Sequence, residues 1–154
     1  MKPIRSRHGV IIARSPKEVW EFISNPGNEK RWHTDVIDGE VLSELPLQQG
    51  SRVRWVMNFG GPRPVTLRVA RFDPPHVLEV QAEHPVMGVA PTLVYEIEPD
   101  DRGALFTRTI EMRPSGPTRL MAPVMRRNVV KSNAQFVGNL KRVLETGSTG
   151  PSLA

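Results

Sequence analysis

Residues 117–145 read PTRLMAPVMRRNVVKSNAQFVGNLKRVLE and carry the longest helical pattern in the sequence. It follows the helix-breaking pair Gly116-Pro117, and apolar side chains recur along it at helical spacing. The apolar stripe expected to face the core consists of Leu120, Val124, Phe136, Leu140, Val143 and Leu144. The pattern predicts one helix of about 25–30 residues, a rod roughly 40 Å long at 1.5 Å per residue.

The sequence before this helix, from residue 36 onward, alternates with the period of two that is typical of β-strands. Val53, Trp55 and Met57, for example, alternate with Arg52 and Arg54. Such alternation predicts a sheet with one packed face and one wet face. Six strands are predicted, at about residues 37–44, 51–58, 65–73, 76–84, 91–98 and 104–113. The connections between them are short and rich in Gly and Pro, which favours antiparallel neighbours.

The first thirty residues predict a strand followed by two short helices. Residues 7–14 are β-branched and bounded by polar residues, so they read as the seventh strand of the sheet. Ser15, Pro16 and Glu18 form a helix start, in which Ser15 caps and Glu18 completes the capping box. Asn25-Pro26-Gly27 ends this helix, and a second short one is expected from residue 28 to residue 32.

Length and composition predict a single α+β domain over residues 1–146, followed by a disordered tail over 147–154. The sequence has 154 residues and no Cys, which excludes disulfides and thiolate metal sites. The four His have no metal-ligand spacing, and no nucleotide-binding motif occurs, so we expect no metal and no cofactor. No signal peptide or membrane span is predicted, and we expect a cytoplasmic protein.

The net charge of +5 raises the question of an anionic partner. Arg and Lys are scattered along every element, a pattern that does not predict a nucleic-acid partner. The one local concentration lies at the start of the long helix and consists of Arg119, Arg126, Arg127 and Lys131. This basic helix face could dock an acidic protein, which leaves an interaction module as one alternative.

A sheet with one apolar face needs a cover, and the long helix is the only predicted element large enough to provide it. A curved sheet around one helix leaves unfilled space where the two diverge. We therefore expect a pocket between sheet and helix.

Several segments resemble the polyketide cyclase/dehydrase and lipid-transport superfamily, also called START-like, Bet v 1-like or SRPBCC. The stretch from Ile12 to Trp20 is similar to the family's strand-to-helix connection, and Asn25 to Trp32 to its second helix. Phe72-Asp73-Pro74-Pro75 is similar to its mid-sheet turn, and Tyr95 to Thr107 to its penultimate hairpin. The resemblance implies the helix-grip fold, with a curved seven-stranded antiparallel sheet around the C-terminal helix. Members of this superfamily include cyclases, lipid carriers and receptors, so the resemblance does not select an activity.

The expected pocket wall combines Trp32, at the end of the second short helix where the resemblance places the cavity mouth, with inward-facing positions of the strands and the first half of the long helix. Met suits a surface that accepts varied apolar ligands. The same residues are also compatible with an ordinary core. They are Trp32, Val53, Trp55, Met57, Leu67, Val80, His84, Tyr95, Met121, Met125 and Asn128.

The acid–base candidates are His33, Asp35 and Tyr95, because proton transfer needs a group such as His beside a carboxylate. A surface loop is the alternative for His33 and Asp35, and a structural hydroxyl is the alternative for Tyr95. The sequence does not decide which side chains of the strand over 104–113 face inward, and the pattern slightly favours an exposed Arg108.

The first hypothesis is a protein that binds a small hydrophobic molecule, lipid-like or aromatic. The alternatives are a polyketide cyclase or dehydratase and the interaction module, and exposed sheet edges are compatible with a homodimer.

Overall fold

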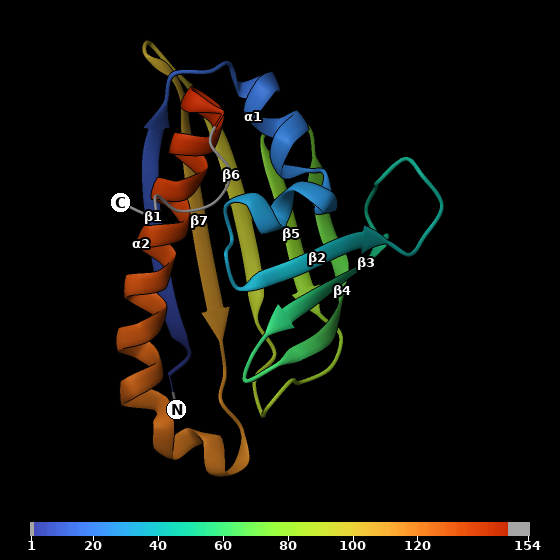
Figure 1. Ribbon diagram of the computed structural model, residues 1–154, viewed down its shortest axis with the longest axis vertical. Coiled ribbons are helices and arrows are strands. Elements are labelled where there is room, and N and C mark those ends of the chain that lie inside the picture. Colours follow the sequence, from blue (N-terminus) through green and yellow to red (C-terminus); the bar gives the residue numbers. More distant parts are fainter. Residues whose placement is uncertain (1, 148–154) are drawn as a thin grey trace.

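The computed structural model describes residues 2–147, and they form one curved sheet gripping a long helix. The order of elements is β1 (Ile4–Ile12), α1 (Pro16–Ile23), η1 (Pro26–Arg31), β2 (Val36–Val41), β3 (Arg52–Asn58), β4 (Pro62–Asp73), β5 (Val77–Ala82), β6 (Thr92–Asp100), β7 (Gly103–Met112), η2 (Gly116–Met121) and α2 (Ala122–Thr146). η1 and η2 are 3₁₀ helices. The seven strands run in the order β1-β7-β6-β5-β4-β3-β2, and α2 crosses the concave face (Figure 1). The predicted helix-grip fold is thus confirmed.

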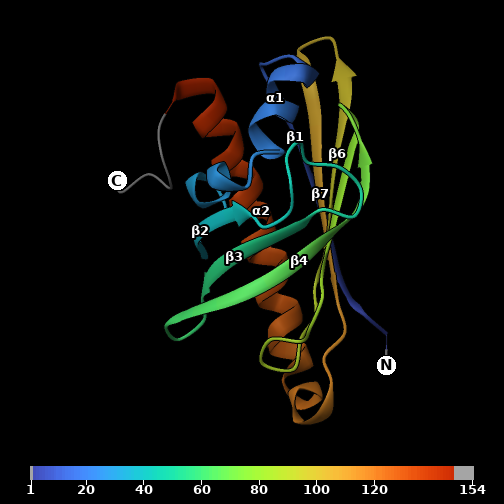
Figure 2. The same ribbon diagram turned by 90° about the vertical axis from the view of Figure 1, so that its right-hand side faces the viewer.

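All neighbouring strands pair antiparallel, and two irregularities bend the sheet. The register shifts between Val36 and Asp38 in the β2–β3 pair and between Val69 and Arg71 in the β4–β5 pair. An extra residue on one strand increases the local twist and bends it. Figure 2 shows the result: β2, β3 and β4 turn away from the plane of the other strands and come round toward the helix.

The two short helices close one end of the sheet. As predicted, Ser15 accepts a hydrogen bond from the backbone N–H of Glu18 at the start of α1. η1 lies directly on β2. The two backbones are so close at Gly39 that a Cβ there would stand 2.5 Å from the carbonyl oxygen of Pro26. Only glycine allows this approach. The contact fixes the position of η1, which carries Glu29.

The two halves of α2 differ in their contacts with the sheet. The second half buries Phe136, Val137, Leu140 and Val143, and Lys141 Nζ donates to the carbonyl oxygen of Ile11 at 2.7 Å. The first half buries only Ala122 before Asn133. The helix therefore packs tightly on β1 and β7 near its C-terminus and diverges from β3 and β4 toward its N-terminus (Figure 2).

Two expectations about the helical segment were wrong. The predicted single helix is divided into η2, which ends at Met121, and α2, which begins at Ala122. Leu120 and Val124, predicted to face the core, are 85% and 53% exposed. They keep helical spacing, but their side chains face solvent. The tail over 148–154 lies outside the described residues, and Gly147 is the αL C-cap of α2.

Candidate functional site

The divergence of α2 from the sheet leaves a cavity of about 500 Å³. β3, β4, β6, β7 and α2 line it, together with the Val86–Pro91 loop. Most of the wall is apolar, and the polar groups in it come from His33, Asp35, Thr118, Asn128, Ser132, Asn133 and Arg108. Several lining residues are also exposed, among them Phe59, Met87 and Met121, so the cavity reaches the solvent-accessible surface at these residues.

The structure distributes the predicted pocket residues over this cavity and its surroundings. Those that line it are Trp55, Met57, Leu67, Met121, Met125, Asn128, His33 and Asp35. Val53, Val80 and Tyr95 line a second void of about 20 Å³ deeper in the core. Trp32 is fully buried between these regions, where its ring meets those of Tyr95 and Phe106 edge-on. His84 lies beyond the end of β5, is exposed and lines neither space.

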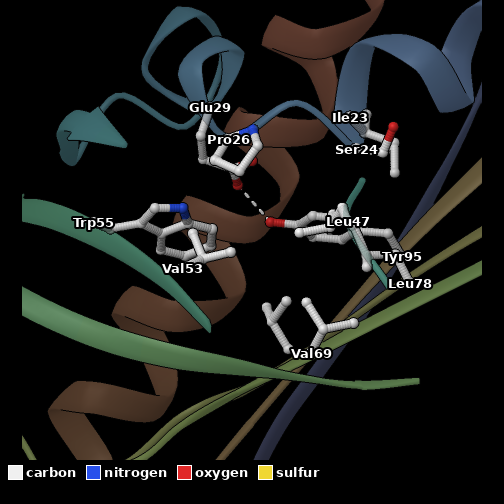
Figure 3. Close-up of a pocket in the computed structure, with 11 residues that line it drawn as sticks. Ile23, Ser24, Pro26, Glu29, Leu47, Val53, Trp55, Val69, Leu78 and Tyr95 are labelled. Atoms are coloured by element: carbon white, nitrogen blue, oxygen red, sulfur yellow. Dashed lines mark hydrogen bonds between the residues drawn. The ribbon is translucent and has the colours of Figure 1, made fainter. Parts of the chain in front are cut away.

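A buried polar cluster separates the cavity from the small void, and Glu29 is its centre. Figure 3 shows the void with the Tyr95 hydroxyl pointing at the Glu29 carboxyl group. Glu29 Oε1 accepts the hydroxyl hydrogen of Tyr95 and lies 3.3 Å from His33 Nδ1. All three side chains are almost completely buried. Sequence reasoning missed this role for Glu29, although its spacing of four residues from His33 is the spacing that brings side chains together on a helical turn.

The hydrogen bonds within the cluster fix the tautomer of His33. Since the Glu29 oxygen accepts, Nδ1 must carry the hydrogen, and Nε2 keeps its lone pair. Nε2 forms no hydrogen bond within residues 2–147, and His33 lines the large cavity. The ring is held between Trp55 and Phe136, with centroid distances of 5.5 and 4.6 Å. His33 therefore lines the cavity with its ring in a fixed orientation, and Nε2 is its one acceptor nitrogen.

Burial governs the pKa values of both titratable partners of Glu29. Burial lowers the pKa of His33, and the hydrogen bond to Glu29 opposes this. Burial also raises the pKa of Tyr95 well above its ordinary value, with the Glu29 carboxyl group adding to the rise. The positive charge of Arg108 opposes this rise in the pKa of Tyr95. Within residues 2–147, Nε and Nη2 of Arg108 have no hydrogen-bond acceptor.

Arg108 is buried, contrary to the slight preference for an exposed position. Its side chain is 1% exposed and lines the cavity beside Ile110. Nη1 donates to Asn133 Oδ1 at 2.7 Å, and the guanidinium lies 5.5 Å from the Phe136 ring centroid and 5.9 Å from that of Trp32. Asn133, which the sequence did not single out, also donates to the backbone oxygens of Ser6 and Arg108. One amide thus joins α2, β1 and β7 behind the cavity.

Two further observations bear on the class of site. Within residues 2–147, no three His, Asp or Glu side chains are placed to hold a metal ion. None of the helices in that range combines the length and hydropathy needed to cross a bilayer.

Known proteins resemble this chain mainly in fold. The di-domain ARO/CYC BexL from the BE-7585A biosynthetic pathway has a TM-score of 0.76 at 17% identity, covering 94% of this chain and 47% of that one. TTHA0849 from Thermus thermophilus has a TM-score of 0.74 at 15% identity, covering 94% and 99%. A protein of unknown function from Staphylococcus aureus, SA2116, has a TM-score of 0.72 at 12% identity, covering 95% and 96%.

Sequence comparison gives the family directly. No curated protein matches the sequence. The family described as polyketide cyclase / dehydrase and lipid transport, in contrast, matches residues 3–145, nearly the whole chain. The protein belongs to this family.

Proposed function

We propose that the protein binds a small, largely apolar molecule in the cavity between α2 and the sheet. The observation that carries this proposal is the cavity itself, about 500 Å³ of open space walled mostly by apolar side chains. This volume lies within the range of about 300–1,000 Å³ that is usual for small-molecule sites. Membership of a family that includes lipid transport supports the same function.

The composition of the wall supports a ligand class rather than one ligand. Met57, Met87, Met112, Met121 and Met125 all line the cavity. Flexible thioether side chains adapt to differently shaped apolar ligands. Polar groups are few, and the buried ones among them, His33, Arg108 and Asn133, would orient one polar group of a lipid-like or aromatic molecule.

A pair of tryptophan substitutions on one helix tests this proposal. Ser132 lines the cavity from α2, whereas Gln135 is exposed on the same helix and does not line it. Ser132→Trp should fill part of the cavity and weaken binding of a dansylated fatty acid at least tenfold. Gln135→Trp should leave binding unchanged. If the wild-type protein enhances dansyl fluorescence no more than the Ser132→Trp variant does, the cavity is not the binding site.

Catalysis as a cyclase or dehydratase is the second candidate, and the orientation of His33 favours it. A neutral imidazole whose Nδ1–H is held by Glu29 keeps a lone pair on Nε2, and in a residue that lines the cavity this nitrogen would act as a general base. Asp35 lines the same cavity and could act as its partner. The base would remove a proton from a carbon next to a ketone, and the freed electron pair would form a bond to a second carbonyl carbon of the chain. The π electrons of that carbonyl would move to its oxygen, which would take the proton back from His33.

His33→Asn separates the binding function from catalysis. The Asn amide can donate the hydrogen bond that Nδ1 donates to Glu29, but it cannot act as a base in place of Nε2. If the protein is a cyclase, this variant should bind the dansylated fatty acid normally. It should also lose the ability to exchange deuterium into the α-position of an aromatic β-diketone. Deuterium incorporation at the uncatalysed rate in the wild-type protein would argue against catalysis and leave the binding function standing.

A further inference from the structure

The end of the molecule where the cavity opens carries an unusual set of exposed apolar side chains. Met87, Leu120, Met121 and Val124 are 62%, 85%, 53% and 53% exposed, and we call these four residues the mouth rim. Met87 and Met121 also line the cavity. In Figure 1 they belong to the lower end of the molecule, where η2 and the start of α2 meet the loop after β5. Apolar side chains gathered at one opening point to a contact surface.

The segment that carries Leu120, Met121 and Val124 has charged residues of one sign. No acidic residue occurs between Glu111 and Glu145, while Arg and Lys recur throughout this segment. Arg119, Arg127 and Lys131 are exposed and form no ion pair or hydrogen bond within residues 2–147. Val124, Arg127 and Lys131 are spaced at i, i+3 and i+7, so they share one flank of α2. An apolar rim with cationic neighbours is complementary to a surface that is anionic outside and apolar inside.

The start of α2 lacks two interactions that usually stabilise the N-terminus of a helix. Its N-cap position is Met121, which makes no capping hydrogen bond, and its first turn contains no acidic residue. A capping side chain usually contributes about 1 kcal/mol and an acidic first turn somewhat less. Departures from local preferences concentrate at functional sites.

The loop that packs against η2 shows a second departure from local preferences. Met87 has a φ of 53°, a left-handed conformation that glycine adopts with far less strain than methionine does. Thr118 Oγ1 donates to the Met87 carbonyl oxygen at 3.4 Å, and Ser115 N–H donates to that of Gly88 at 3.0 Å. The loop is thus held against η2 with an exposed methionine at a position that favours glycine.

We propose that the mouth rim docks on the surface of an anionic phospholipid bilayer. Leu120, Val124 and Met87 would enter the boundary between headgroups and acyl chains, while Arg119, Arg127 and Lys131 would meet the lipid phosphates. The cavity would then open directly onto the apolar layer, giving an apolar ligand a path that avoids water. This last step rests on the proposed function; the docking does not. A flat acidic protein is the less suitable partner, because it offers no apolar interior to four protruding side chains.

Vesicle sedimentation tests the docking with two kinds of rim variant and a charge-matched control. The wild-type protein should bind vesicles of phosphatidylcholine with phosphatidylglycerol and bind pure phosphatidylcholine much more weakly, with the difference shrinking in high salt. Each basic side chain near such a surface contributes roughly a fivefold gain in affinity. Arg127→Glu with Lys131→Glu should therefore weaken binding by about 25-fold or more. Lys17→Glu with Arg102→Glu, on α1 and the β6–β7 turn, should change it little.

The apolar variant distinguishes a bilayer from any other anionic surface. Leu120→Ser with Val124→Ser keeps the charge and should weaken vesicle binding at least tenfold. The same variant should bind soluble polyglutamate as the wild type does. Equal loss on both probes would indicate an acidic protein as the partner and overturn the proposal, as would failure of the wild type to bind phosphatidylglycerol vesicles. Ser132→Trp should retain vesicle binding, so failure of cavity binding and failure of docking remain distinguishable.

Discussion

His33 Nδ1 lies 3.3 Å from Glu29 Oε1, and this contact turns an imidazole in the protein core into a group with one defined tautomer. The same oxygen accepts from Tyr95, so one carboxyl group orients two titratable side chains from different elements. Because His33 and Tyr95 are both buried, the imidazolium form of His33 and the tyrosinate form of Tyr95 are less stable in the folded protein than in water. The folding stability should therefore depend on pH at both ends of the scale.

At acidic pH the protein should lose stability through His33. Its folded-state pKa is lowered below the ordinary value of about 6.5, so the unfolded chain binds a proton first as the pH falls. The stability is fully present above pH 6.5 or so and declines below it, by at most about 1.4 kcal/mol per pH unit for this one proton. Urea denaturation of the wild type and His33→Asn between pH 5 and pH 8 should show a flatter profile for the variant.

The exposed His84 provides the control for this experiment, because His84→Asn removes an imidazole that does not touch Glu29. Its profile should follow that of the wild type. If His84→Asn flattens the profile and His33→Asn does not, burial of His33 is not the source of the acid sensitivity.

At alkaline pH the single tyrosine of the chain gives a direct readout. Tyr95 is the only Tyr, so tyrosinate absorbance reports on it alone. Its folded-state pKa is raised above 10, and the folded protein therefore keeps the proton longer than the unfolded chain does. Stability should be full below about pH 10 and decline above it. The native protein should show no tyrosinate until it unfolds, whereas the protein in guanidinium chloride should titrate near pH 10. A native titration that coincides with the denatured one would contradict the burial of this hydroxyl.

Asn133 and Asn128 lie on the same helix and should differ sharply in their effect on stability. Asn133 Oδ1 is the hydrogen-bond acceptor for Arg108, and its Nδ2 atom bonds Ser6, whereas Asn128 is exposed. Asn133→Ala leaves a buried guanidinium without an acceptor and should cost about 2–4 kcal/mol of unfolding free energy. Asn128→Ala should stay within about 0.5 kcal/mol of the wild type by urea denaturation. Equal costs would mean that the Arg108–Asn133 bond does not stabilise the fold.

The order of elements could be predicted because each signal acts over a few residues. The alternation of Val53, Trp55 and Met57 placed them on the packed face, where all three are buried. Arg108 could not be placed in this way, because both parities of β7 are covered: Thr107 and Thr109 are buried as well. When neither face is wet, alternation carries no information on direction.

The polar cluster and the mouth rim escaped prediction for related reasons. Glu29 is typical of a surface residue, and only the approach of η1 to β2 removes it from water. Leu120 and Val124 keep the helical spacing that predicted them as core. Periodicity shows which side chains share a face of a helix, but not whether another element lies against that face.

The loop after β5 allows a test of whether Met87 serves stability at all. Met87 has φ at 53° and an exposed side chain, so it loses conformational energy without burying much surface. Met87→Gly relieves a strain of about 1–2 kcal/mol and adds roughly 0.5–1 kcal/mol of backbone entropy cost. The unfolding free energy should therefore stay level or rise by up to about 1.5 kcal/mol. Met87→Ala keeps the Cβ in the same conformation and should show no such gain.

If Met87 belongs to a docking surface, both variants should bind anionic vesicles more weakly than the wild type. A Gly variant that is clearly less stable would show instead that the methionine side chain holds the loop in place.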